Sequence, residues 1–185
     1  MQQALIIIDV QNDYFPQGNM ELNQAEQTLQ QVLTLRDHFR QQQLPIFYIL
    51  HTNLDPAATF FRPNTQGEAL HPQLLPLQSV QEKIVPKNYP NSFFKTDLQQ
   101  QLAHHNIKQL IICGMMSHMC VDSTTRCAAE LGYQPILIDD ACTTRDLTFK
   151  NNIIPANQVH NSFMAALARF AQIQSTQEFI STHQQ

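Results

Sequence analysis

The chain has few glycines, few charged residues and no tryptophan: four glycines and 14% charged residues among 185. Dinucleotide-binding folds need a G-x-G-x-x-G turn after their first strand, and no such turn follows the apolar run near the N-terminus. The formal net charge of -4 at pH 7 gives no basic surface for nucleic acid or for acidic membranes. These absences argue against dinucleotide-binding and nucleic-acid-binding proteins and favour a small molecule as the partner.

Disulfide and zinc patterns are also missing. The four cysteines are Cys113, Cys120, Cys127 and Cys142. They form no C-x-x-C pair, and a chain of 185 residues buries enough surface to fold without disulfides, so we expect reduced thiols. The apolar run Leu5–Val10 has no basic segment before it and is too short for a signal peptide or a membrane span. We therefore expect one cytoplasmic domain over residues 1–185.

Apolar runs alternate with amphipathic segments, and this alternation predicts the fold class. Unbroken runs rich in β-branched residues are typical of strands buried on both faces, whereas apolar residues at helical spacing predict helices. We expect strands at 4–9, 45–51, 80–85, 109–113 and 135–138, and helices at 24–43, 96–104, 120–131, 158–170 and after the capping box of Ser175 and Glu178. Residues 52–79 have no period and predict a long loop. The order predicts an α/β fold of three layers, α/β/α, with a Rossmann-like, mainly parallel sheet and helices on both faces.

Three reactive side chains follow predicted strands. Asp9 ends the first strand, Lys87 follows the third, and Cys120 follows the fourth strand and its turn. Parallel strands bring such ends to one edge of the sheet, where ligands bind. A thiol at a helix N-terminus beside an ammonium favours the thiolate, and a neighbouring carboxylate can move its proton. The pattern predicts a cysteine nucleophile, with backbone N–H groups of the turn 115–120 as donors to the oxyanion.

Several motifs occur together along nearly the whole chain. They are IDVQNDYF at 8–15, Pro86-Lys87 with Ser92-Phe93, GMMSHMCV at 114–121 with Thr124-Thr125-Arg126, DDAC at 139–142 and VHNSF at 159–163. In this combination the chain resembles the isochorismatase-like cysteine hydrolases, which include nicotinamidases, carbamoylsarcosine amidases and ureidoacrylate amidohydrolases. The resemblance implies a hydrolase that cleaves the C–N bond of a small amide, carbamoyl or ureido substrate. It also implies a homo-oligomer.

The same resemblance implies roles for individual residues. Asp9 is expected to be the general base, Lys87 to stabilise the thiolate, and Cys120 to form a thioester with the substrate. The family places a cis peptide bond before the nucleophile, here between Met115 and Met116. That bond is expected to aim the amides of Met116 and Cys120 at the oxyanion.

Three more residues are candidates for contact with the substrate. By family position Phe15 is expected to form an aromatic wall of the pocket, with simple core packing as the alternative. His118, in the nucleophile turn, either contacts substrate or bonds within the protein. Arg145 either holds a substrate carboxylate through a bidentate pair or forms an ion pair with Asp140 or Asp146.

A metal site is not predicted. Nicotinamidases of the resembled family bind a divalent ion through an Asp-x-His motif and a later histidine. Here His51-Thr52-Asn53-Leu54-Asp55 has a different order and spacing, so we interpret His51, Asp55 and His71 as polar loop residues. The prediction is an enzyme without a metal ion or other cofactor.

Two alternatives remain open. Enol-ether cleavage of the isochorismatase type uses the acidic residue and does not need the thiol. A non-catalytic binding or assembly protein would retain the fold with an inactive pocket. Fast alkylation of Cys120 by iodoacetamide near neutral pH is expected for a low-pKa nucleophile and not for an inert core thiol.

Overall fold

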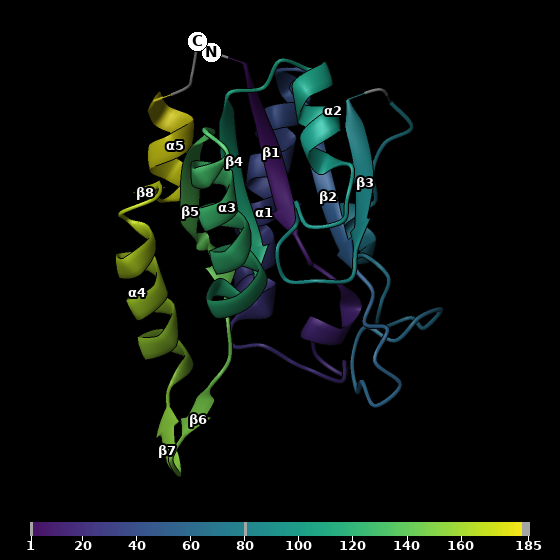
Figure 1. The fold of residues 1–185 in the computed structure, drawn as a ribbon, viewed down its shortest axis with the longest axis vertical. Coiled ribbons are helices and arrows are strands. Elements are labelled where there is room, and N and C mark those ends of the chain that lie inside the picture. The colour runs from purple at the N-terminus through teal and green to yellow at the C-terminus, as the bar shows by residue number, and fades with distance from the viewer. Residues whose placement is uncertain (1, 80, 183–185) are drawn as a thin grey trace.

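The centre of the molecule is a six-stranded sheet between two layers of helices (Figure 1). The computed structural model describes residues 2–79 and 81–182. The strands of the sheet are β1 (Gln3–Ile8), β2 (Ile46–His51), β3 (Glu82–Lys87), β4 (Gln109–Met115), β5 (Gln134–Thr143) and β8 (Gln172–Gln174). The helices are α1 (Ala25–Gln41), α2 (Leu98–His104), α3 (Asp122–Glu130), α4 (Ala156–Leu167) and α5 (Thr176–Thr182). All strands pair in parallel, in the order β3-β2-β1-β4-β5-β8, which confirms the predicted α/β/α architecture.

The central strand β1 shows why its sequence is apolar throughout. Every residue of β1 is buried. Leu5 and Ile7 belong to the core shared with α1 and α5, whereas Ala4, Ile6 and Ile8 belong to the core shared with α2, α3 and α4. Since alternate strand residues point to opposite faces, one apolar run supplies both cores. Each buried large side chain contributes about 1.5 to 3 kcal/mol, so β1 fixes the middle of the sheet.

The strand order creates a topological switch point between β1 and β4. From β1 the sheet grows through β2 and β3, and from β4 it grows on the other side through β5 and β8. Ile8 pairs with Gly114 at this point, where a Cβ on Gly114 would lie 2.1 Å from the Ile8 carbonyl oxygen. The glycine therefore lets the two strand ends approach closely. Ligands of parallel sheets bind beyond the carboxyl ends at such a point.

Two element boundaries near the reactive side chains differ from the prediction. The strand predicted at 80–85 extends to Lys87, which is therefore a strand residue, while Val80 lies outside the described residues. The helix predicted from Cys120 begins earlier, with a π-helical turn over Ser117–Val121 that continues into α3. Cys120 thus lies inside a helical segment and not at its first residue.

β5 is longer than the predicted strand 135–138. Its pairing with β4 shifts after Ile112 and then resumes, with Cys142 opposite Gly114 and Thr143 opposite Met115. The irregularity lets β5 continue past two aspartates. As a result, the end of β5 reaches the same edge of the sheet as the turn that carries Cys120.

A small hairpin and the edge strand β8 are missing from the sequence prediction. The hairpin pairs β6 (Leu147–Phe149) with β7 (Asn152–Ile154) and projects beyond α4 (Figure 1). Its turn residues Lys150 and Asn151 have φ values of 49° and 65°, as a type I′ turn requires, but Lys-Asn is a weaker signal for this turn than Asn-Gly. β8 has the sequence Gln-Ile-Gln, which contains no apolar run.

The structure also confirms the predicted capping box and the predicted long loop. Ser175 and Glu178 form the predicted capping box at α5, with the Glu178 N–H donating to Ser175 Oγ at 3.3 Å. The predicted loop 52–79 is confirmed as mainly irregular among its described residues. None of the described helices is long and apolar enough to cross a membrane. The single domain over 1–185, the cytoplasmic location and the homo-oligomeric state stay predictions.

Candidate functional site

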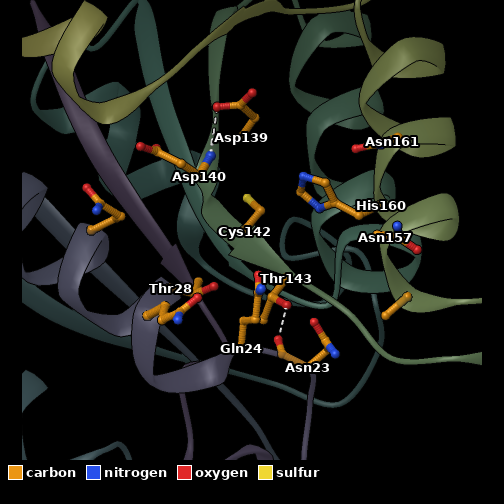
Figure 2. Close-up of a pocket in the computed structure, with 13 residues that line it drawn as sticks. Asn23, Gln24, Thr28, Asp139, Asp140, Cys142, Thr143, Asn157, His160 and Asn161 are labelled. Atoms are coloured by element: carbon orange, nitrogen blue, oxygen red, sulfur yellow. Dashed lines mark hydrogen bonds between the residues drawn. The ribbon is translucent and has the colours of Figure 1, made fainter.

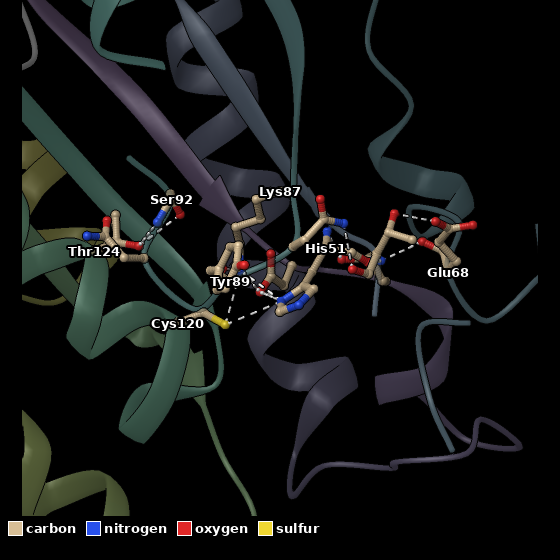
Figure 3. Close-up of polar contacts among 12 residues, drawn as sticks. His51, Glu68, Lys87, Tyr89, Ser92, Cys120 and Thr124 are labelled. Carbon is tan, nitrogen blue, oxygen red and sulfur yellow. Dashed lines mark hydrogen bonds and ion pairs between the residues drawn. The ribbon is translucent and has the colours of Figure 1, made fainter. Parts of the chain in front are cut away.

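The structure brings Asp9, Lys87 and Cys120 together at the carboxyl edge of the sheet. Figure 3 shows Lys87 and Cys120 in this cluster. Lys87 Nζ lies 2.8 Å from Asp9 Oδ2 and 3.1 Å from Cys120 Sγ. The side chains of Asp9 and Lys87 are fully buried, and Cys120 is 4% exposed. Asp9 follows β1, Lys87 ends β3, and Cys120 lies in the π-helical turn after β4. The three predicted residues therefore meet as the strand-end argument requires.

A fourth side chain, His51, joins this cluster. Its Nδ1 lies 3.0 Å from Lys87 Nζ, 3.6 Å from Asp9 Oδ2 and 3.8 Å from Cys120 Sγ. His51 is the last residue of β2, so its interpretation as a loop residue is wrong. The available signal was its place at the end of an apolar strand, the same signal that singled out Asp9. We call Asp9, His51, Lys87 and Cys120 the ammonium site.

The ammonium of Lys87 fills the place where these ligand types would hold a cation. Asp9, His51 and Cys120 each offer an atom within 4.8 Å of the others, a spacing that suits a metal ion. Lys87 Nζ lies between 2.8 and 3.1 Å from one atom of each of them. A metal ion at the same point would have to displace a buried ammonium from its carboxylate, which is costly.

The other two residues considered as metal ligands, Asp55 and His71, lie outside the ammonium site. Asp55 Oδ1 accepts from the Ala57 N–H within its own loop, at 2.9 Å. His71 Nδ1 accepts from the Gln73 N–H at 3.3 Å, and its ring packs on Phe15 with centroids 4.5 Å apart. Their interpretation as polar loop groups is therefore consistent with their contacts.

Burial and neighbouring charges shift the pKa values of the ammonium site in opposite directions. Burial raises the pKa of Asp9, but Lys87, followed by His51 and Cys120, together outweigh burial and hold that pKa below its ordinary value. Burial lowers the pKa of Lys87, but Asp9 and Cys120 leave it above its ordinary value. The pKa of the Cys120 thiol is raised, first by burial and then by the carboxylate of Asp9. These charges favour a protonated resting thiol over the expected thiolate, because one ammonium already pairs with one carboxylate.

A proton can nevertheless move inside the ammonium site without changing its charge. Transfer from the Cys120 thiol to Asp9 produces a thiolate beside Lys87 and a neutral carboxylic acid. Asp9 Oδ1 is buried and has no hydrogen-bond partner among the described residues, so an oxygen is available for that proton. The arrangement therefore allows the thiol to be activated by internal proton transfer, without a permanently lowered pKa.

The turn that carries Cys120 begins with a cis peptide bond and is closed by backbone hydrogen bonds. The Met115–Met116 peptide bond is cis, as the resemblance implies. The Met116 carbonyl accepts from the N–H groups of Met119 at 3.0 Å and Val121 at 3.3 Å. The assignment of the Met116 and Cys120 amides as oxyanion donors stays a prediction.

Ser117, in the same turn, links it to β5 and α4. Its hydroxyl donates to the Thr143 carbonyl at 3.1 Å and lies 2.8 Å from His160 Nδ1. Because the single hydroxyl hydrogen goes to the carbonyl, His160 Nδ1 must be the donor to Ser117 Oγ. This chain of bonds fixes the turn against the end of β5.

Two of the three predicted substrate contacts have partners in the protein. His118 Nδ1 is hydrogen-bonded to Thr144 Oγ1, and its ring meets Phe163 edge-on with centroids 6.0 Å apart. Burial and then the charge of Arg145 lower the pKa of His118. Phe15 packs on His71 and lines a depression of about 580 Å³ beside residues 66–67. Contact of either side chain with substrate stays a prediction.

Different aromatic rings flank the ammonium site. The ring of Phe61 lies 6.0 Å from that of His51 and 4.6 Å from that of Tyr14. Tyr14 is buried, and burial followed by the charges of Cys120 and Asp9 raises the pKa of its hydroxyl well above the ordinary value. Sequence reasoning missed Phe61, because it lies in the long loop whose spatial position no periodicity predicts.

Arg145 does not form an ion pair with Asp140 or Asp146, which was one of the two interpretations of its role. Its Nη1 donates to the backbone oxygen of Asp146 at 3.1 Å, and its Nε is buried without a partner among the described residues. The Asp146 carboxylate instead accepts from the Ala156 N–H, and the Asp140 carboxylate accepts from Thr176. Its charge lowers the pKa of both Tyr14 and His118.

A second cluster of reactive groups lies beside β5 (Figure 2). Here Asp139, Cys142 and His160 line a cavity of about 390 Å³ between α1 and α4, which we call the β5 pocket. Burial raises the pKa of Asp139 and of Cys142. Among the described residues, no lysine or arginine lines this cavity. The β5 pocket therefore has a carboxylate, a thiol and an imidazole without a cation.

The chain is similar to one group of proteins along nearly its whole length. The family model described as Isochorismatase domain matches residues 3–178. The uncharacterised isochorismatase family protein YddQ of Bacillus subtilis (strain 168) is 44% identical over 181 residues, which is 97% of this chain and 99% of the relative. Nicotinamidase 3 of Arabidopsis thaliana is 26% identical over 76% of this chain and 73% of its own. A solved structure of a candidate isochorismatase hydrolase from Oleispira antarctica has a TM-score of 0.92 at 40% identity, covering 97% of this chain and 96% of that chain.

Proposed function

The chain belongs to the isochorismatase family of hydrolases, and we propose that it is a cysteine-dependent amidohydrolase for a small amide, carbamoyl or ureido substrate. One observation carries this proposal. A buried ammonium, Lys87 Nζ, lies 2.8 Å from the Asp9 carboxylate and 3.1 Å from the Cys120 sulfur, at the switch point of the sheet. These groups supply a base, a nucleophile and a fixed positive charge in one water-poor place.

The first half of the reaction forms a thioester. Asp9 takes the thiol proton, and the sulfur of Cys120 attacks the substrate carbonyl carbon. The carbonyl electron pair moves to oxygen, where the N–H groups of Met116 and Cys120 stabilise the negative charge. When that pair returns, the C–N bond breaks and the nitrogen takes the proton from Asp9. An amine or ammonia leaves, and the charge of the site is unchanged throughout.

The second half releases the sulfur. Asp9, ionised again, takes a proton from water while the water oxygen attacks the thioester carbon. The C–S bond breaks, and the sulfur leaves as a thiolate that recovers the proton from Asp9. Lys87 balances the negative charge on whichever of the two groups carries it. The reaction needs these side chains and water, without a metal ion.

Arg145 gives the proposal a substrate preference. A buried guanidinium nitrogen without a partner costs about 1 to 3 kcal/mol, which a bound carboxylate would recover. We therefore expect a substrate that carries a carboxylate a short distance from its amide or carbamoyl group. In Arg145→Gln the KM should rise about 10-fold or more for N-carbamoylsarcosine and stay within about 2-fold for nicotinamide, which has no carboxylate. Equal changes for both compounds would contradict this role.

The test of the proposed function is direct observation of the intermediate. The protein is mixed with N-carbamoylsarcosine, nicotinamide or the activated acyl donor p-nitrophenyl acetate and quenched for mass spectrometry. An acyl or carbamoyl adduct is expected on Cys120, and it is absent from Cys120→Ala. Cys142→Ala, which changes another buried thiol, is the matched control and retains adduct and turnover. Full hydrolysis by Cys120→Ala would sink the proposal, because it would show that the reaction does not need the thiol.

A further inference from the structure

The ammonium of Lys87 has more acceptors than hydrogens. Its neighbours are Asp9 Oδ2 at 2.8 Å, His51 Nδ1 at 3.0 Å, Cys120 Sγ at 3.1 Å and the Tyr89 carbonyl oxygen at 3.1 Å. A lysine ammonium has three hydrogens to donate. Four acceptors therefore share three hydrogens, and a change at any one of them redistributes the bonds to the other three.

The contact with Lys87 fixes the tautomer of His51. An ammonium has no lone pair, so Lys87 donates and His51 Nδ1 accepts. The raised pKa of Lys87 keeps it in the ammonium form. The ring proton of His51 must then be on Nε2, and the ring is neutral. His51 thus offers Lys87 one permanent lone pair.

The protein also holds His51 firmly in place. The His51 N–H donates to Gln11 Oε1 at 2.8 Å, and Gln11 Nε2 donates back to the His51 carbonyl at 2.9 Å. Gln11 is fully buried, so this pair of bonds is protected from water. The ring of Phe61 lies beside the imidazole with centroids 6.0 Å apart. Gln11 Nε2 also donates to the Glu68 carbonyl oxygen at 2.5 Å, so the buried amide ties the end of β2 to the following loop and limits the positions that the imidazole can take.

We propose that His51 is a positioning residue that holds the Lys87 ammonium against Asp9 while Cys120 is acylated. The inference rests on the proposed function, since it concerns the thioester stage. A thiolate accepts a hydrogen bond strongly, whereas a thioester sulfur is a weak acceptor like a thioether. On acylation Lys87 loses one of its four acceptors. The three remaining acceptors then match the three hydrogens, and the bond that His51 Nδ1 already accepts keeps Lys87 beside Asp9 and keeps Asp9 ionised to activate water.

Three substitutions separate this role from other uses of an imidazole. In His51→Asn the amide oxygen lies near the position of Nδ1 and still accepts from Lys87. In His51→Gln the amide lies nearer the position of Nε2, and His51→Leu has no acceptor at all. Hydrolysis of the thioester should slow about 100-fold in the His51→Leu and His51→Gln variants, because Lys87 is no longer held in position beside Asp9. The Asn variant should recover most of that loss.

The measurement uses p-nitrophenyl acetate. Release of p-nitrophenol in the first turnover reports acylation, and the decay of acetyl-Cys120 by mass spectrometry reports deacylation. The expected result is a thioester that accumulates in Leu and Gln variants, with acylation changed much less than deacylation. Rescue by Gln and not by Asn would overturn the inference, as would equal loss in all three correctly folded variants. An absence of any adduct on Cys120 in the unmodified protein would instead refute the proposed function.

A readout without substrate tests the resting contact. The ¹⁵N resonances of labelled histidine distinguish the two neutral tautomers of His51. The Nε2–H form is expected in the unmodified protein, and Lys87→Met should remove the preference. An Nδ1–H form in the unmodified protein would overturn the inference whatever the variants do in turnover.

Discussion

The ammonium site and the β5 pocket contain the same three reactive kinds of side chain, but the ammonium site also contains the ammonium of Lys87. Each has a carboxylate, a buried thiol and an imidazole at the carboxyl edge of the sheet. In the ammonium site Lys87 lowers the pKa of Asp9, whereas in the β5 pocket burial raises the pKa of Asp139. The proposed function therefore predicts that Cys120 is the nucleophile and Cys142 is not, because Lys87 is a buried cation that can balance the charge moving between the Cys120 thiol and its carboxylate.

Removal of that cation should have the largest effect. In Lys87→Met the Asp9 carboxylate stays buried without its partner, which costs about 3 to 5 kcal/mol of unfolding free energy. Turnover should fall about 100- to 1,000-fold, because the thiolate and oxyanion stages lose their fixed positive charge. Urea unfolding and initial rates measure the two effects. The ammonium site would then resemble the β5 pocket in reactivity.

Two controls sharpen this result. Lys83→Met changes an exposed lysine on the same strand and should alter neither stability nor rate appreciably. The double variant Asp9→Asn with Lys87→Met removes the unpaired charge and should regain most of the lost stability, while remaining inactive. If the double variant is less stable than Lys87→Met alone, the loss does not come from an unpaired carboxylate.

The two carboxylates should respond to pH with opposite signs. The pKa of Asp9 is lowered from 3.8 on folding, so its stabilising contribution is present above pH 3.8 and is lost as pH falls through the folded value. The pKa of Asp139 is raised from 3.8, so its contribution is present below pH 3.8 and is lost as pH rises through the folded value. At about pH 7, Asp9→Asn should therefore destabilise the protein, and Asp139→Asn should stabilise it. Unfolding free energies at about pH 7 and about pH 3 check both signs; the same sign for both variants would remove the contrast.

The buried thiols should differ modestly in reactivity. Cys120 and Cys142 both have a raised pKa, so a small alkylating reagent should label both slowly near neutral pH and faster as pH rises. Because Lys87 stabilises one thiolate, Cys120 should react about 10-fold faster than Cys142. Lys87→Met should erase that difference. Peptide mapping after timed labelling measures both rates, and fast selective labelling of Cys120 at neutral pH would restore the low-pKa expectation.

The smallest expected effect is that of Ser117, which joins the two regions. Ser117→Ala removes bonds to Thr143 and His160, and one such bond contributes about 1 kcal/mol. Turnover should fall about 5-fold as the nucleophile turn loosens, with KM little changed. Thr34→Ala, which removes an exposed hydroxyl in α1, is the control. A loss as large as that of Lys87→Met would show that the two regions do not act separately.

Much of the ammonium site follows from the sequence, because strand ends can be found from apolar runs. Asp9, Lys87 and Cys120 each follow such a run, and parallel strands bring their ends together. His51 also follows such a run, but it was compared with a metal-binding motif and therefore interpreted as a polar loop residue. The direction of the shift in the Cys120 pKa could not be predicted, since the burial of the thiol depends on how the layers of the fold pack. The π-helical turn likewise depends on a carbonyl contact that leaves no periodic signal.

The strand order also determines when the thiol acquires its partners. Asp9, His51 and Lys87 all lie on the first half of the chain, in the β1–β3 side of the sheet, and Cys120 lies on the second half. During synthesis the charged groups leave the ribosome before the sulfur does. Cys120 reaches them only when β4 pairs with β1, so a chain that ends before β4 has the charged groups without the sulfur.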